Sequence, residues 1–148
     1  MIYNKDERGE TMRKTSKILF LVGGILALLL SIMWLVFGIF FLIDAGAAIA
    51  YRDGGELDPQ VMQMFDNWIA ETGISPTEII ILFLTCGISS IVFFVFSIPA
   101  AVLSFVCQGK DKPSLSLLII TTAISFFGGT AASVAGGVLG IIANGLKK

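Results

Sequence analysis

The stretch from Ser114 to Leu146, SLSLLIITTAISFFGGTAASVAGGVLGIIANGL, decides how many times this chain crosses a membrane. It contains 33 residues and no charged side chain. A single helix of that length would measure about 50 Å, whereas a hydrocarbon core is about 30 Å thick. Gly128-Gly129 interrupts the stretch near its middle. We therefore expect two short spans joined by a tight turn, with span three over 114–127 and span four over 130–146.

The composition of the whole chain excludes a water-soluble domain. Of its 148 residues, 55% are hydrophobic and 14% are charged, and the mean hydropathy is +0.89. Two further apolar runs, Ile18 to Ile43 with 26 residues and Ile79 to Val106 with 28, are each longer than the 18 or so residues that mark a membrane helix. The sequence therefore predicts an all-α membrane protein, with span one over 18–50 and span two over 75–107.

The distribution of charge predicts the orientation of these spans. Nine of the ten basic residues lie in the tail 1–17, in the turn 108–113 and at Lys147-Lys148, whereas the segment 44–78 has seven acidic residues and one arginine. Because cytoplasmic segments are rich in Lys and Arg, the three basic clusters are expected inside and the loop 51–74 outside. Four spans satisfy this pattern, and the alternative of three spans would leave the last two lysines outside.

We accordingly expect one membrane domain over 1–148, a four-span helical bundle in the cell membrane with both termini cytoplasmic. Residues 1–17 are polar and mixed in charge, and we expect a frayed tail whose last turn joins the first helix. Ala48-Ile49-Ala50 has the form of a signal-peptide cleavage site. The preceding apolar run is longer than the 7–15 residues of a signal core, so we expect a retained anchor.

Asp44 follows the first apolar run directly and is the candidate intramembrane acid. A carboxylate inside the membrane can bind a proton or a cation. The alternative is a solvated acid at the outer end of the helix. The position of Asp44 favours that alternative, because the 26 apolar residues before it already suffice to cross.

The outer loop carries the signals of a short amphipathic helix over 59–72. Asp58 and Pro59 are typical of an N-cap and a first helical position, and Gly73 is expected to end the helix. Apolar side chains recur at i, i+3, i+4, i+7 and i+8 and form one face, which is the candidate partner-binding surface: Val61, Met64, Phe65, Trp68 and Ile69. Because the opposite face is acidic, the apolar face is expected to cap the bundle or to bind a partner protein, and not to bind anionic lipid.

Small residues predict a packing seam in span four. They recur at a strict four-residue spacing: Ala132, Gly136, Gly140 and Asn144. Such a line lets two helix backbones approach closely in lipid. The seam serves either a contact within the bundle or a homo-oligomer.

No residue pattern of catalysis or metal binding is present in the sequence. The chain has no histidine, and Cys86 and Cys107 lie 21 positions apart, about 30 Å along one helix, so they cannot pair within the chain. We expect no enzyme activity, no cofactor and no nucleic-acid partner. The expected function is that of a small membrane protein that acts through protein–protein contact as an accessory subunit, or as an envelope-stress or immunity-type factor. The alternative is a small oligomeric transporter or channel that uses Asp44.

Three segments carry a resemblance to a known family: RKTSKILFLVGGILALLLSIMWLVFG (13–38), GKDKPSLSLLIITTAISF (109–126) and ASVAGGVLGIIANGLKK (132–148). They resemble a family of small bacterial membrane proteins, mostly Gram-positive, that is classed as a domain of unknown function. The resemblance covers nearly the whole chain except the loop 44–73. It implies four spans and supplies no activity and no site residues.

Overall fold

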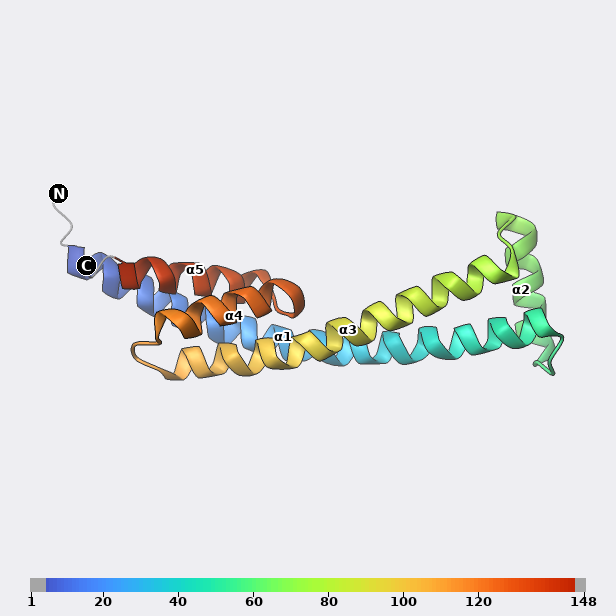
Figure 1. Cartoon of the computed structure of the whole chain (residues 1–148), viewed down its shortest axis with the longest axis horizontal. Helices are drawn as coiled ribbons and strands as arrows, with labels where there is room; N and C mark the ends of the chain where they lie inside the picture. The colour runs from blue at the N-terminus through green and yellow to red at the C-terminus, as the bar shows by residue number, and fades with distance from the viewer. Residues whose placement is uncertain (1–4, 146–148) are drawn as a thin grey trace. The chain divides into compact units, whose positions relative to one another are not determined.

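The structure is a computed structural model that describes residues 5–145 as helices and connecting turns, without a strand in that range. The five helices follow one another as α1 (Lys5–Asp53), α2 (Pro59–Thr72), α3 (Pro76–Gly109), α4 (Leu115–Gly128) and α5 (Ala131–Gly145) (Figure 1). Within the described residues, α1 and α3 are the two helices long and apolar enough to cross a membrane. The other two apolar helices, α4 and α5, are shorter.

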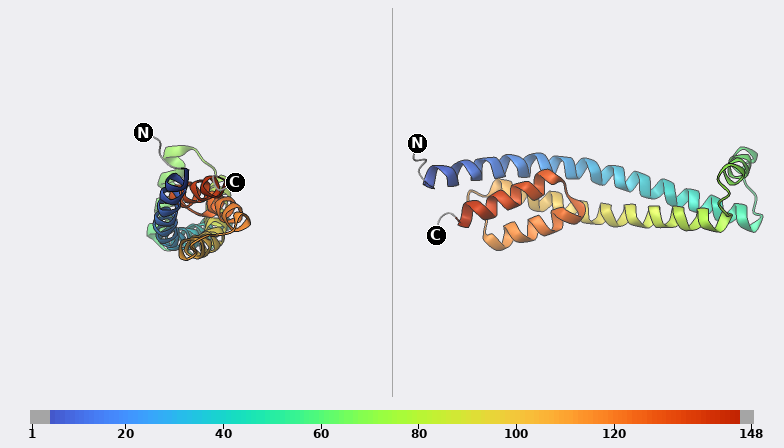
Figure 2. Two further views of the ribbon diagram at one scale, coloured as in Figure 1. Left: turned by 90° about the vertical axis from the view of Figure 1, so that its left-hand side faces the viewer. Right: turned by 90° about the horizontal axis from the view of Figure 1, so that it is seen from above.

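The helices form two compact units. Unit 1 comprises residues 1–33 and 93–148, and unit 2 comprises residues 34–92. Unit 1 therefore holds the first part of α1, the last part of α3, and the pair α4 and α5, which lie side by side along them (Figures 1 and 2). Unit 2 holds the remaining parts of α1 and α3, and α2 lies across their ends (Figure 2).

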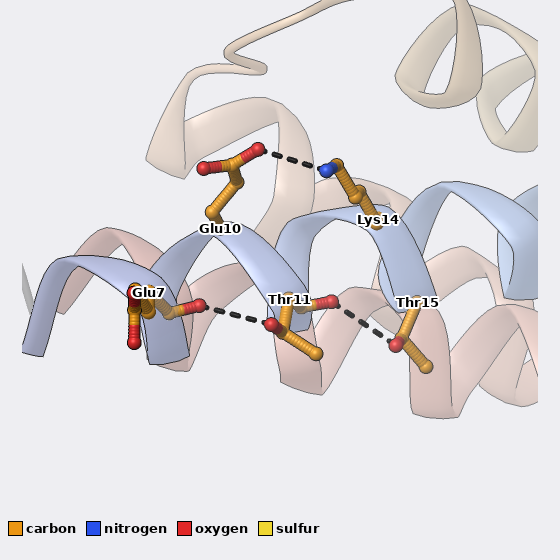
Figure 3. Close-up of polar contacts among 5 residues, drawn as sticks. All are labelled: Glu7, Glu10, Thr11, Lys14 and Thr15. Carbon is orange, nitrogen blue, oxygen red and sulfur yellow. Dashed lines mark hydrogen bonds and ion pairs between the residues drawn. The ribbon is translucent and has the colours of Figure 1, made fainter. Parts of the chain in front are cut away.

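The helix α1 begins at Lys5, so the prediction of a frayed tail is wrong for residues 5–17; residues 1–4 lie outside the described part of the chain. Contacts one turn apart support this charged segment (Figure 3). Thr11 Oγ1 donates a hydrogen bond to the Glu7 carbonyl at 2.9 Å, and Lys14 Nζ lies 2.9 Å from Glu10 Oε1. The Glu10–Lys14 contact is an i,i+4 ion pair, and such pairs add stability to an exposed helix.

Most of the buried side chains in each unit are small, with a few large exceptions such as Phe20 and Phe65, and most large apolar side chains are exposed. Ala27 and Ala100 are fully buried in unit 1, and so is Ala48 in unit 2. Ile18 is 62% exposed and Phe126 is 76% exposed. The buried polar side chains of the described residues are serines and threonines. This is the pattern of helices that pack through small residues while lipid covers the larger ones.

The pair α4 and α5 is a helical hairpin in unit 1. Ser114 caps α4 by accepting a hydrogen bond from the Leu117 amide at 3.2 Å, and Gly129-Thr130 forms the turn. The two helices contain 14 and 15 residues, which correspond to lengths of about 21 and 23 Å. The helices expected as spans three and four are thus present, but each is shorter than a hydrocarbon core of about 30 Å.

Candidate functional site

The candidate site is α2 in unit 2, and local signals fix both of its ends. Asp58 is the N-cap and accepts a hydrogen bond from the Gln60 amide at 2.8 Å, while Pro59 occupies the first helical position. Gly73 ends the helix in the left-handed region (φ 67°), where its amide donates to the Ile69 carbonyl. Pro59–Thr72 is the range expected from the sequence.

The apolar face of α2 is buried against its own chain. Phe65 is 2% exposed and belongs to a cluster with Ala48 of α1 and with Ile79 and Ile80 of α3. Three other residues of the predicted face pack against that cluster: Val61, Trp68 and Ile69. The fifth, Met64, is 55% exposed. The structure therefore places four of the five candidate partner-binding side chains in an intramolecular contact.

Two tilted aromatic contacts and one hydrogen bond hold α2 in its orientation. The ring centroids of Tyr51 and Phe65 lie 5.2 Å apart, and those of Trp68 and Phe83 lie 5.6 Å apart. The Tyr51 hydroxyl donates a hydrogen bond to Asp66 Oδ1. That bond, together with desolvation and the negative charge of Asp66, raises the pKa of Tyr51. Because the bond needs a protonated phenol, it supports the folded state at neutral pH and is lost as the pH rises through the raised pKa.

The opposite face of α2 is exposed and held in a fixed orientation. A shallow, open groove runs along it, and its lining consists of Gln60, Gln63, Met64, Asn67, Trp68 and Glu71. Five of these side chains are exposed, and Trp68 forms the edge shared with the buried face. The groove thus combines amide groups, one carboxylate and the flexible side chain of Met64. Periodicity alone could not identify this surface as the accessible one, because it does not show what the apolar face contacts.

The charges around α2 are predominantly acidic. Asp66 is exposed on the helix, and Glu56 and the N-cap Asp58 are exposed just before it. Arg52 is the single basic residue of the segment 44–78, and its Nε lies 2.8 Å from Asp53 Oδ1. That guanidinium holds the pKa of Asp53 below its usual range. The positive charge is therefore neutralised locally, and the surface of α2 keeps a negative field.

Asp44 lies in unit 2 on α1 and is partly buried. Its carboxylate has no hydrogen bond or ion pair with another described residue. The same residues contain no group of three His, Cys, Asp or Glu side chains that would hold a metal ion. The structure thus brings no second acid or ligand to Asp44. Cys107 is buried in unit 1, where its Sγ lies 3.2 Å from Thr121 Oγ1, and Cys86 is half-buried in unit 2.

The predicted seam residues lie on α5 inside unit 1. Gly136 is buried against Ser16, Leu19 and Phe20 of α1, and Ser16 Oγ donates a hydrogen bond to the Gly136 carbonyl at 2.6 Å. Gly140 is buried against Leu118 of α4, whereas Ala132 and Asn144 are half-buried. The helix also buries Ser133, Gly137 and Ala143. The face in contact is therefore broader than the single four-residue line, because α5 meets both α1 and α4.

Comparisons with protein-family models, with characterised proteins and with solved structures gave no match to this chain. The resemblance to a family of small bacterial membrane proteins accordingly stays a prediction from the sequence.

Proposed function

We propose that this protein is a multi-pass protein of the cytoplasmic membrane with both ends in the cytoplasm and α2 on the outer side. The large exposed apolar side chains of α1 and α3 support this placement, since water would not stabilise them and lipid does. The separation of basic from acidic segments supports the orientation. In this arrangement α1 and α3 both cross the membrane completely.

We further propose that α4 and α5 form a re-entrant hairpin that enters and leaves on the cytoplasmic side. Ser133, near the start of α5, packs against Gly23 of α1, and Thr130 Oγ1 donates to the Gly23 carbonyl at 3.4 Å. Gly23 lies six residues beyond Lys17, which is about 9 Å along α1. The turn of the hairpin would then lie inside the bilayer. Four full spans remain the competing prediction.

The biochemical function that we propose is non-enzymatic binding of a partner protein through the groove on α2. The observation that carries this proposal is that one face of α2 is buried against its own chain while the other face is exposed. Its apolar face is occupied by α1 and α3, which leaves the groove with Met64 and Asn67 exposed on a fixed support. A preorganised surface loses little conformational entropy on binding. The acidic surroundings favour a partner with a basic contact surface. In binding such a partner, this protein would act as an accessory subunit or as an envelope-stress or immunity-type factor.

Site-specific photo-crosslinking in intact cells tests this function. A photoreactive amino acid at position 64 lies in the groove, whereas the same residue at position 65 lies on the buried face. We expect a discrete crosslinked protein from position 64 and none from position 65. The charge reversal Glu71→Lys should weaken that adduct several-fold, because the partner contact is electrostatic.

Positions 64 and 65 are adjacent, so the two variants serve as matched controls for each other in expression and membrane insertion. An adduct of equal yield from positions 64 and 65 would show that the crosslinks are indiscriminate. The absence of an adduct from positions 64 and 67 in cells grown under envelope stress would contradict the proposed function.

A further inference from the structure

A small polar cleft lies in unit 1, at the end where the charged part of α1 meets the α3–α4 turn and the last turn of α5. Its lining includes Arg13, Ser16 and Lys17 of α1, Cys107 of α3, Asp111 of the turn and Asn144 of α5. The enclosed volume is about 10 Å³. That volume accommodates one water molecule or one oxygen atom of a larger group. The rest of such a group would lie at the opening of the cleft, which we call its mouth.

Most of the polar groups in the cleft already have partners. Lys17 Nζ lies 2.7 Å from Asp111 Oδ1, Ser16 Oγ donates to the Gly136 carbonyl, and Asn144 Nδ2 donates to the Pro113 carbonyl at 3.2 Å. The ammonium of Lys17 has three donors, and the bond to Asp111 uses one of them. The cleft therefore has spare donors beside a single carboxylate.

Arg13 has a donor that the described residues leave without an acceptor. Its Nη2 donates a long hydrogen bond of 3.5 Å to the Ala143 carbonyl near the end of α5. Its Nε is buried and has no hydrogen-bond partner among residues 5–145. A buried, charged donor without an acceptor is unfavourable, and a bound acceptor removes that penalty. The guanidinium Nε and Nη groups are the donors that bind phosphate oxygens most specifically.

We propose that this cleft binds a phosphate group, with one phosphate oxygen accepting the hydrogen bond from Arg13 Nε–H and another accepting from Lys17. An anionic phospholipid headgroup is the source that the position of the cleft favours. Lys17 is the last charged residue before the apolar run Ile18 to Ile43, so in the proposed topology the mouth lies at the level of the headgroups. Lys110 and Lys112 in the adjoining turn add attraction for an anion.

The thermal aggregation of the purified full chain in a non-ionic detergent tests this site. Short-chain phosphatidylglycerol, short-chain phosphatidylcholine and inorganic phosphate are titrated separately. A ligand that binds the folded state raises the midpoint as its concentration increases. We expect a rise with phosphatidylglycerol and none with phosphatidylcholine. An equal rise of the midpoint with inorganic phosphate would support a phosphate site in the cleft and identify the free anion, not the lipid headgroup, as its ligand.

Three variants separate the cleft from general charge attraction. Arg13→Gln should raise the apparent Kd for the anion by on the order of tenfold or more, because one charge-assisted hydrogen bond is lost. Arg13→Lys keeps the charge but removes the Nε donor, so it should weaken binding as well. Lys14→Gln removes a neighbouring charge that pairs with Glu10, and it should leave binding nearly unchanged.

Two results would overturn the proposal. One is a set of midpoints that neither phosphatidylglycerol nor phosphate raises, which would mean that the cleft holds only water. The other is an equal loss of binding in Arg13→Lys and Lys14→Gln, which would mean that the anion interacts with the basic surface and not with the cleft.

Discussion

Single glycines determine how closely the helices of unit 1 approach each other. A methyl group added at Gly23 of α1 would lie 2.5 Å from the Ser133 amide nitrogen and 2.9 Å from its Cα, both backbone atoms of α5. A backbone cannot move aside as a flexible side chain can. Contacts between helices in lipid depend on close packing, so the lost fit has no hydrophobic compensation.

We therefore predict that Gly23→Ala destabilises the protein by about 1–3 kcal/mol, the usual effect of overpacking. Gly46 provides the matched control, because it lies in the same helix and has no atom within 4 Å of an added methyl group. Both substitutions raise helix propensity equally. Thermal aggregation in detergent should show a lower midpoint for Gly23→Ala and an unchanged or higher midpoint for Gly46→Ala. Equal midpoints would refute the close contact between α1 and α5.

At the scale of the element, the sequence predicts helix ends better than helix partners. Asp58, Pro59 and Gly73 act on the nearest turns of backbone, so they fix α2 without reference to the rest of the chain. What covers the apolar face of α2 depends on α1 and α3. The sequence therefore leaves two alternatives for that face, a contact with the bundle and a contact with a partner protein. Arg13 belongs to the segment 1–17, which the sequence predicts to be a frayed tail. Its spacing of three and seven residues from Ser16 and Phe20, both buried, is the signal that places it beside unit 1.

The hairpin of α4 and α5 makes the second prediction at this scale. Its helices are too short to cross a core of about 30 Å, so a cysteine at position 131, exposed at the start of α5, should lie inside the bilayer. In a chain with Cys86 and Cys107 changed to serine, a membrane-impermeant maleimide should not label Ala131→Cys in intact cells. Labelling as fast as that of a cysteine at position 64 would instead establish four full spans.

At the scale of the whole molecule, charged and apolar segments alternate along the chain. The described Asp, Glu, Lys and Arg side chains other than Asp44 lie in the segments 7–17, 52–78 and 110–112, and the apolar parts of α1 and α3 separate these segments. Burying a charge in lipid is costly, so these segments fix where the chain leaves the bilayer. The basic character of the first and third segments and the acidic character of the second then fix the sides.

The proposed function requires that the α2 groove be accessible from outside the cell, and thiol labelling measures this directly. Met64→Cys places a thiol in the groove, and Asp111→Cys places one in the α3–α4 turn, both in the background without Cys86 and Cys107. We predict that a membrane-impermeant maleimide labels position 64 in intact cells and labels position 111 after the membrane is permeabilised. Labelling of position 64 only after permeabilisation would contradict the topology and, with it, the proposed contact with an outer partner.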